Sequence, residues 1–240
     1  MEAPKLTQEF KVRVSEVHFN RKLNLTALAD YLQEVAWVHA SILGVNVPDL
    51  LPRNLTWALS RMKIEVTELP VEGDMVIVET WPSGFERFTA FRTFQILDRN
   101  RKVLVSATSS WLIFNIKTRR MVEIPDDVRL VKGTGDKHLS QSIPKFGSYT
   151  QEKQFPVRIL ETDINDHANN VTYFNWLVES IPLEFLKTHE IKRVEIQFKG
   201  EAVLGDEIIT RSEPQEDHIY LHQIINQSGK ELVRARTTWC

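Results

Sequence analysis

The sequence has one cysteine, Cys240, among 240 residues. A single cysteine excludes an internal disulfide framework and a metal site built on several cysteines. No apolar run approaches the ~18 residues that a bilayer-spanning helix needs. The first ten residues, MEAPKLTQEF, lack the basic and apolar regions of a signal peptide. We therefore expect a soluble, cytoplasmic protein with no membrane partner.

Strong charge is also absent, since the formal net charge is −2 at pH 7. This gives no reason to expect nucleic acid or an anionic membrane as partner. There is no glycine-rich phosphate loop and no G-x-S-x-G elbow, which argues against nucleotide chemistry and a serine hydrolase. His218 and His222 are four residues apart, but in an expected strand that spacing lacks its helical meaning. We expect no metal and no cofactor.

An internal repeat is present. RKVLVSATSSW (101–111) returns as GKELVRARTTW (229–239), and PVEGDMVIVETW (70–81) returns as AVLGDEIITRSE (202–213). NLTALADYLQEVAW (24–37) similarly answers NVTYFNWLVESIP (170–182). The alternating segments predict strands and the other pair predicts helices, so each copy reads as helix, strand, Gly-Asp turn, strand, turn, strand.

The helices indicate how the copies fold. The first repeats apolar residues at Leu25, Leu28, Leu32, Val35 and Ile42, whereas the second is apolar on nearly every side. A helix that is apolar all round must be enclosed. We therefore predict an α+β double hotdog, in which a long helix is wrapped by a curved antiparallel sheet twice. The predicted domains are residues 1–125 and 156–240, joined by a linker at 126–155 that is rich in Pro, Gly, Ser and charge.

Three polar residues precede the second helix at alternate positions, Asp163, Asn165 and His167. In an extended segment this spacing places them on one face, beside a helix N-terminus whose unpaired N–H groups attract negative charge. Turn or capping roles are the default for single Asp and Asn residues. Asn169 and Asn170 are both candidate N-caps for this helix.

Comparing the copies favours a chemical role for this set. Aligning Asn24 with Asn170 places Val17, Phe19 and Arg21 opposite the three polar residues. On this alignment the first copy has lost the polar set, so we expect catalysis in the second copy. The first copy then supplies scaffold or an apolar pocket for substrate, with Leu28, Leu32 and Trp37 as the candidate lining.

The segment DINDHANNVTYFNWLVES (163–180) resembles the signature of the acyl-acyl-carrier-protein thioesterases, double-hotdog enzymes of plant plastids and their bacterial relatives. LTWALSRMKIEV, SSWLIFNIKTRRMVEIPDDVR and FKGEAVLGDEI also resemble family segments, in family order. The resemblance implies catalytic roles for Asp163, Asn165 and His167, and for a glutamate that falls on Glu201. Plant members have a cysteine directly after this glutamate. Here that position is Ala202, which fits hydrolysis by activated water.

The resemblance implies hydrolysis of fatty acyl-acyl carrier protein. From the helix N-terminus itself we expect backbone N–H groups near Asn169 and Asn170 to hold the oxyanion. An acyl-CoA thioesterase is the nearest alternative. A hotdog hydratase or dehydratase and a non-catalytic acyl-binding protein are further alternatives. Because the carrier is expected to be acidic, the basic residues Lys117, Arg119 and Arg120 are a candidate docking site, against the default of a solvated turn. A homodimer is left open.

Overall fold

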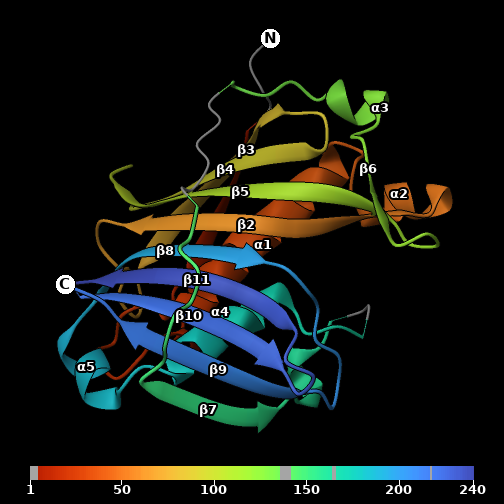
Figure 1. The fold of residues 1–240 in the computed structure, drawn as a ribbon. Coiled ribbons are helices and arrows are strands. Elements are labelled where there is room, and N and C mark those ends of the chain that lie inside the picture. The colour runs from red at the N-terminus through yellow and green to blue at the C-terminus, as the bar shows by residue number, and fades with distance from the viewer. Residues whose placement is uncertain (1–4, 136–141, 164–165, 217) are drawn as a thin grey trace. The chain divides into compact units, whose positions relative to one another are not determined.

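The computed structural model describes residues 5–135, 142–163, 166–216 and 218–240. The chain divides into two compact units, the first unit at residues 1–139 and the second unit at residues 140–240. Each unit packs a helix against its own antiparallel strands (Figure 1).

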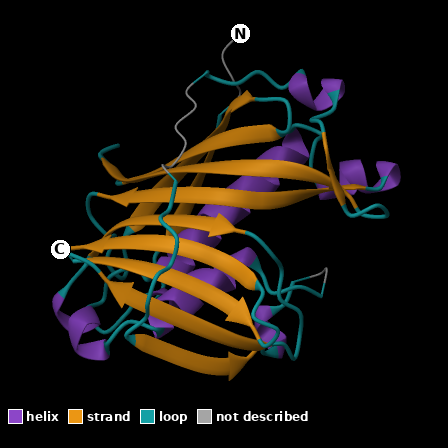
Figure 2. Ribbon diagram, viewed as in Figure 1, coloured by secondary structure: helices purple, strands orange, loops and turns teal. Residues whose placement is uncertain are grey.

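In the first unit the strand order is β1-β3-β4-β5-β2, with β6 paired to β5, and all of these pairs are antiparallel. The long helix α1 lies against β3 and β1, and Figure 2 shows it in purple beside the orange strands. The elements are β1 (Leu6–Lys11), η1 (Val14–Glu16), α1 (Leu25–Ile42), α2 (Val47–Leu50), η2 (Leu51–Arg53), β2 (Leu55–Val66), β3 (Met75–Phe85), β4 (Thr89–Leu97), β5 (Val103–Asn115), β6 (Arg120–Val122) and α3 (Asp126–Arg129).

Helix α1 begins where Asn24 caps it, because the Asn24 side chain accepts the Ala27 N–H at 2.7 Å. Leu28, Leu32 and Val35 recur at helical spacing and are fully buried. Ile42 was expected on the same apolar face but is 67 % exposed. It is the last residue of α1, where the unit no longer covers the helix.

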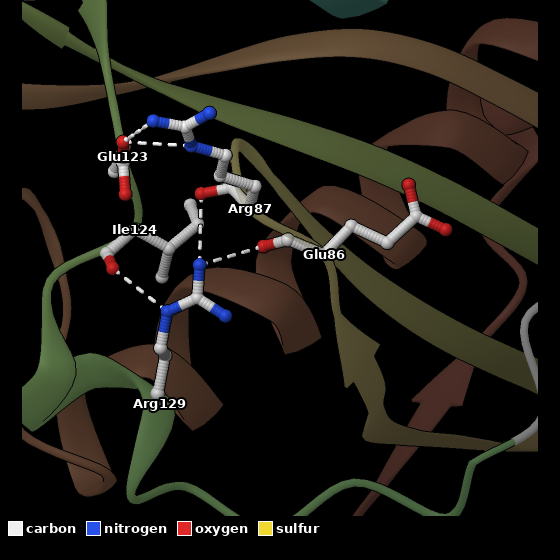
Figure 3. Close-up of polar contacts among 5 residues, drawn as sticks. All are labelled: Glu86, Arg87, Glu123, Ile124 and Arg129. Atoms are coloured by element: carbon white, nitrogen blue, oxygen red, sulfur yellow. Dashed lines mark hydrogen bonds and ion pairs between the residues drawn. The ribbon is translucent and has the colours of Figure 1, made fainter.

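A cluster of contacts holds α3 on the β3–β4 hairpin (Figure 3). The Arg129 guanidinium donates to the carbonyl oxygens of Ile124 at 2.9 Å, Glu86 at 2.9 Å and Arg87 at 2.8 Å. The Arg87 guanidinium in turn donates to Glu123 Oε1 at 2.7 Å through Nε. The Arg129 side chain thus joins the segment before α3 to the turn between β3 and β4, which stabilises that end of the β3–β4 hairpin.

In the second unit the strand order is β8-β11-β10-β9-β7, again antiparallel throughout. Helix α4 contacts β9 and β10. The elements are β7 (Gln151–Pro156), η3 (Ile159–Glu161), α4 (Asn170–Glu179), α5 (Leu183–Thr188), β8 (Ile191–Phe198), β9 (Glu207–Pro214), β10 (Ile219–Asn226) and β11 (Glu231–Trp239).

The structure adds strands to the order expected from the repeat. A strand precedes each long helix, β1 in the first unit and β7 in the second, and β4 and β10 complete the hairpins. Secondary structure also enters the segment predicted as linker, residues 126–155, since α3 lies within it and β7 begins in it and ends one residue beyond it. These elements pack on their own units, α3 through Arg129 and β7 through its pairing with β9.

The two units repeat one pattern of backbone hydrogen bonds before their long helices. In the first, the His18 N–H donates to the Lys22 oxygen at 3.0 Å. In the second, the Asp163 N–H donates to the His167 oxygen at 2.8 Å. The residue before each acceptor, Arg21 or Asp166, has φ near 60°. These contacts align residue 18 with 163 and residue 22 with 167.

The same alignment continues into the turns that follow. Each has a glycine with positive φ, Gly73 at 90° and Gly205 at 84°, a conformation that favours glycine. The carboxylate after each glycine accepts a backbone N–H at 3.0 Å, from Val71 to Asp74 and from Val203 to Asp206. The Gly-Asp turns predicted from the repeat are therefore built identically. Among the described residues, no helix combines the length and apolar character needed to cross a membrane.

Candidate active site

The turn before α4 carries the predicted polar residues. Asp163 and His167 are joined through their backbones, and the Asp166 N–H closes the turn on the Asp163 oxygen at 3.1 Å. Asp166 adopts positive φ, which Asp tolerates better than most residues. Asn165, the third residue predicted here, lies outside the described residues.

The structure brings His167 and Glu201 together. His167 forms an isolated β-bridge with Val203, two residues beyond Glu201. His167 Nδ1 lies 3.6 Å from Glu201 Oε2, which is beyond hydrogen-bond distance but within the range of an ion pair. The His167 side chain is 33 % exposed and that of Glu201 is 57 % exposed. A base and a carboxylate thus meet at a surface that substrate and water can reach.

The N-terminus of α4 adjoins this pair in the chain. Asn169 is the N-cap, and its side chain accepts the Val171 N–H at 3.1 Å. The Asn169 N–H donates to the Glu161 oxygen at 2.8 Å. Within the described part of the chain the Asn170 N–H has no hydrogen-bond acceptor. Because the Asn169 N–H is already bonded to Glu161, the Asn170 N–H is the remaining candidate of the two for binding an oxyanion.

Sequence reasoning missed a hydrogen bond made by Tyr173. Its hydroxyl oxygen accepts the backbone N–H of Ala202, the residue after Glu201, at 2.9 Å. Burial raises the pKa of the Tyr173 hydroxyl, and Glu201 and Asp206 add to that rise against a lowering contribution from the Ala202 hydrogen bond. Tyr173 therefore stays protonated at neutral pH. The only available sequence signal was its place inside the family signature.

A glutamate braces the segment on the other side. The Glu161 carboxylate accepts the Arg158 N–H at 2.8 Å and the Trp176 indole N–H at 3.3 Å. The first unit has the same arrangement, because Glu16 accepts the Arg13 N–H at 2.8 Å and the Tyr31 hydroxyl at 2.6 Å. This brace shapes the repeat, since both units contain it.

The alignment of the copies made from sequence was wrong by one residue. It matched Asn24 with Asn170, but both the caps and the backbone hydrogen bonds match Asn24 with Asn169. Val17, Phe19 and Arg21 are therefore not the counterparts of the polar set. The error arose because Asn169 and Asn170 are adjacent and either could cap the helix.

The true counterparts are polar. Asp163 matches His18 and His167 matches Lys22, while by count along the chain position 165 matches Asn20. The first copy has therefore changed the chemistry of these positions without losing their polarity. The two units differ more strongly at the position of Glu201, because its counterpart in the first unit is the apolar residue Leu69.

A second difference surrounds that carboxylate. In the first unit Lys102 forms an ion pair with Glu68 at 2.6 Å. The corresponding residues of the second unit are Lys230 and Gly200, and the Lys230 side chain passes over the glycine. A Cβ at Gly200 would meet Lys230 Cε at 3.0 Å. The carboxylate of the second unit, Glu201, thus stands one position later in the repeat than Glu68 of the first unit.

The predicted pocket residues of the first unit do not share one wall. Leu28 and Leu32 are fully buried, whereas Trp37 is 42 % exposed. Nine residues at ~100° each place Trp37 about half a turn away from Leu28. Only Leu28 and Leu32 face the same core.

The predicted docking residues Lys117, Arg119 and Arg120 are exposed on the β5–β6 hairpin. Among the described residues none of the three forms an ion pair. Two apolar side chains flank them, Ile116 at 46 % and Met121 at 43 % exposure. We call these five residues the basic hairpin.

The other histidines do not form a metal site in the part of the chain that the structure describes, where no three His, Cys, Asp or Glu side chains are grouped for one. His222 is fully buried, with Nε2 2.8 Å from Thr237 Oγ1. Burial lowers the pKa of His222 to about 3, so it is a neutral core residue at physiological pH.

Known proteins are similar to this chain in sequence. Two relatives, a chloroplastic acyl-[acyl-carrier-protein] hydrolase of Cuphea viscosissima and a chloroplastic palmitoyl-acyl carrier protein thioesterase of Arabidopsis thaliana, are 30 % and 28 % identical. The matches include 97 % of this chain but only 61 % and 63 % of the relatives. The chain thus spans about three fifths of the length of these relatives.

Two solved structures show the same fold. An acyl-ACP thioesterase from Bacteroides thetaiotaomicron superposes with a TM-score of 0.91 at 24 % identity, covering 98 % of both chains. The 12:0-ACP thioesterase from Umbellularia californica superposes with a TM-score of 0.89 at 24 % identity, covering 98 % of this chain and 97 % of that one. This likeness confirms the predicted double-hotdog fold.

Family models agree with the resemblance first noticed in the helix signature. Residues 4–131 match the acyl-ACP thioesterase N-terminal domain and residues 147–240 match its C-terminal domain. The chain therefore belongs to the acyl-ACP thioesterase family.

Proposed function

We propose that the protein hydrolyses the thioester of a fatty acyl chain on acyl carrier protein, releasing free fatty acid and holo-acyl carrier protein. The observation that carries this proposal is the approach of His167 to Glu201, with 3.6 Å between Nδ1 and Oε2. The names of the relatives, which include an acyl-[acyl-carrier-protein] hydrolase, support the same reaction.

The chemistry requires an activated water, a stabilised oxyanion and a proton for the leaving sulfur. Glu201 takes a proton from a water molecule, whose oxygen attacks the thioester carbonyl carbon. The backbone N–H of Asn170 donates to the developing oxyanion. Protonated His167 gives its proton to the sulfur as the carbon–sulfur bond breaks. The proton held by Glu201 then returns to His167, so each cycle places one hydrogen of water on the thiol.

Asp163 and Asn165 complete the proposed site, as the family resemblance implies. Asp163 is the second candidate for the water-activating base, and Asn165 orients the water or the carbonyl. Ala202 carries no thiol, so the proposed route forms no acyl-cysteine at that position. No metal or cofactor enters these steps.

The two units have different proposed roles. The second unit carries the chemistry, and the first receives the acyl chain against Leu28 and Leu32, which are fully buried on one face of α1. The basic hairpin binds the acidic carrier protein, since its three cations are exposed and an exposed apolar side chain lies on either side. A cytoplasmic location and a homodimer remain predictions.

One assay tests the reaction against its alternatives. Purified protein is incubated separately with acyl-acyl carrier protein, acyl-CoA and an enoyl thioester, while free thiol and the carbon-chain product are measured. We expect thiol release that is fastest with acyl-acyl carrier protein and slower by at least ~10²-fold, but still measurable, in Glu201→Gln. Faster thiol release from acyl-CoA would indicate an acyl-CoA thioesterase instead. Hydration of the enoyl chain would indicate a hydratase. Binding of the acyl thioester without turnover would contradict the proposal.

A further inference from the structure

Side-chain differences between the two units single out one hydrogen bond beside the proposed base. The counterpart of Tyr173 in the first unit is Leu28, which has no hydroxyl group. The counterpart of Ala202 is Pro70, which has no backbone N–H. Donor and acceptor are thus both present in the second unit and both absent from the first. They occur together with Glu201, whose counterpart is Leu69.

The geometry at Ala202 shows what this hydrogen bond restrains. The Ala202 N–H donates to the Tyr173 hydroxyl at 2.9 Å, and the Ala202 carbonyl accepts the Ala168 N–H at 2.9 Å. Ala202 is fully buried and Tyr173 is 2 % exposed. The residue after Glu201 is therefore tied to helix α4 by its nitrogen and to the segment before α4 by its oxygen.

The Tyr173 ring is itself held in place. Its centroid lies 4.7 Å from that of Trp176 and 5.7 Å from that of Phe198, both in edge-on contact. Such packing leaves the hydroxyl little freedom to move. In the first unit only the carbonyl contact remains, from the Leu23 N–H to the Pro70 oxygen at 2.8 Å. The nitrogen contact is therefore not needed to build the repeat.

We propose that Tyr173 is a positioning residue for catalysis, which holds Glu201 opposite His167 through the Ala202 amide. This inference rests on the proposed function, because Glu201 is the base of that mechanism. Catalytic groups must be held to within a fraction of an ångström, so a looser Glu201 slows the chemical step more than it weakens substrate binding.

The test compares Tyr173→Phe with Tyr31→Phe. Tyr31 is also buried in the long helix of its unit, at 5 % exposure, and its hydroxyl donates to Glu16 at 2.6 Å. We expect Tyr173→Phe to lower kcat by ~10-fold to 100-fold with KM little changed, the scale of a lost orienting contact. Tyr31→Phe should leave both constants near the wild-type values.

A double-mutant cycle distinguishes positioning from general weakening of the fold. In the Glu201→Gln background, the further change Tyr173→Phe should cost little, because the group it positions is already inactive. Equal costs in both backgrounds would overturn the inference. So would a wild-type kcat in folded Tyr173→Phe.

A second variant covers the case in which Tyr173→Phe does not fold. Tyr173→Leu combined with Ala202→Pro recreates the pair found at Leu28 and Pro70, which the first unit accommodates at the same backbone positions. We expect this double variant to fold and to lose turnover, and retention of wild-type turnover would overturn the inference. If wild type and Tyr31→Phe release no thiol from acyl-acyl carrier protein, the proposed function fails instead.

Discussion

His167 Nδ1 lies 3.6 Å from Glu201 Oε2, although the two are 34 positions apart in the chain. A small rotation of either side chain would bring these atoms within hydrogen-bond distance, and catalytic contacts often tighten only when substrate binds. His167 and Glu201 are therefore close enough to exchange a proton after a small movement, although they form no hydrogen bond in this structure.

We expect His167→Ala and Asp163→Ala each to lower turnover by at least ~10²-fold, the usual effect of removing a positioned acid or base. His167 is partly exposed, so its removal should leave the fold intact. Thiol release from acyl-acyl carrier protein is the measurement, with circular dichroism as the check on folding. A folded variant with near-normal turnover would remove its residue from the mechanism.

Reversing the charge of the basic hairpin should weaken carrier binding. For the triple variant Lys117→Glu, Arg119→Glu, Arg120→Glu we expect a higher KM for acyl-acyl carrier protein at low salt and an unchanged rate with acyl-pantetheine, which carries no protein. The control reverses three other exposed lysines, Lys11, Lys132 and Lys145. Equal effects in both variants would point to net charge rather than to a docking surface.

Shortening the buried face of α1 should change acyl-chain preference. Leu28→Ala and Leu32→Ala are expected to shift the profile of kcat/KM towards longer chains, since each buried methylene contributes ~0.8 kcal/mol. Trp37→Ala is the control, because Trp37 lies on the opposite face and is 42 % exposed. If both leucines only fill the core, the variants will lose ~2–5 kcal/mol of stability with an unchanged profile.

Two buried histidines should make the protein sensitive to acid. Burial lowers the pKa of His222 to about 3, and burial together with Arg92 lowers that of His39 to about 4, from an unfolded value of 6.5. Between those values the unfolded state binds more protons, so the free energy of unfolding falls as pH falls. Each histidine contributes up to ~1.4 kcal/mol per pH unit.

His222→Phe tests this assignment. The counterpart position in the first unit is Phe94, which faces Ala107 as His222 faces Ala235. We expect urea unfolding at pH 7, 6 and 5 to show a shallower loss of stability in the variant than in wild type. Parallel curves for the two proteins would show that His222 does not take up the proton.

Arg129→Ala should destabilise the first unit. The variant loses the three hydrogen bonds to the carbonyl oxygens of Ile124, Glu86 and Arg87. We expect a loss of ~2 kcal/mol, because bonds to a charged donor are stronger than average. Arg53→Ala is the control, since Arg53 reaches the same helix only through an exposed ion pair with Asp127 at 2.8 Å. Equal midpoints of thermal unfolding for both variants would contradict this.

Periodicity predicted the long helices and the paired Gly-Asp turns, because a turn such as that at Gly205 and Asp206 is encoded locally. The strands β4 and β10 were not predicted, since the repeated segments compared in the sequence did not include their residues. The copy alignment slipped by one residue at Asn169 and Asn170, because capping chemistry is the same for both.

The site was predictable only in part. Asp163 and His167 were singled out by their alternate spacing before a helix, and Glu201 by the family resemblance. The 3.6 Å approach of His167 to Glu201, however, depends on the β-bridge at Val203. The bond between Tyr173 and Ala202 joins residues 29 positions apart. No local pattern encodes such a contact, because it is set by how α4 packs on its own unit.

The match of Leu69 with Glu201 has a consequence for how such a protein can change. In a symmetric dimer of identical chains, one mutation alters both copies at once, so a carboxylate gained at one site is imposed on the other. A tandem duplication removes that obligation, because the two positions are separate codons. One codon can specify an acid while the other specifies a hydrocarbon side chain, and the same pattern of backbone hydrogen bonds accommodates both residues.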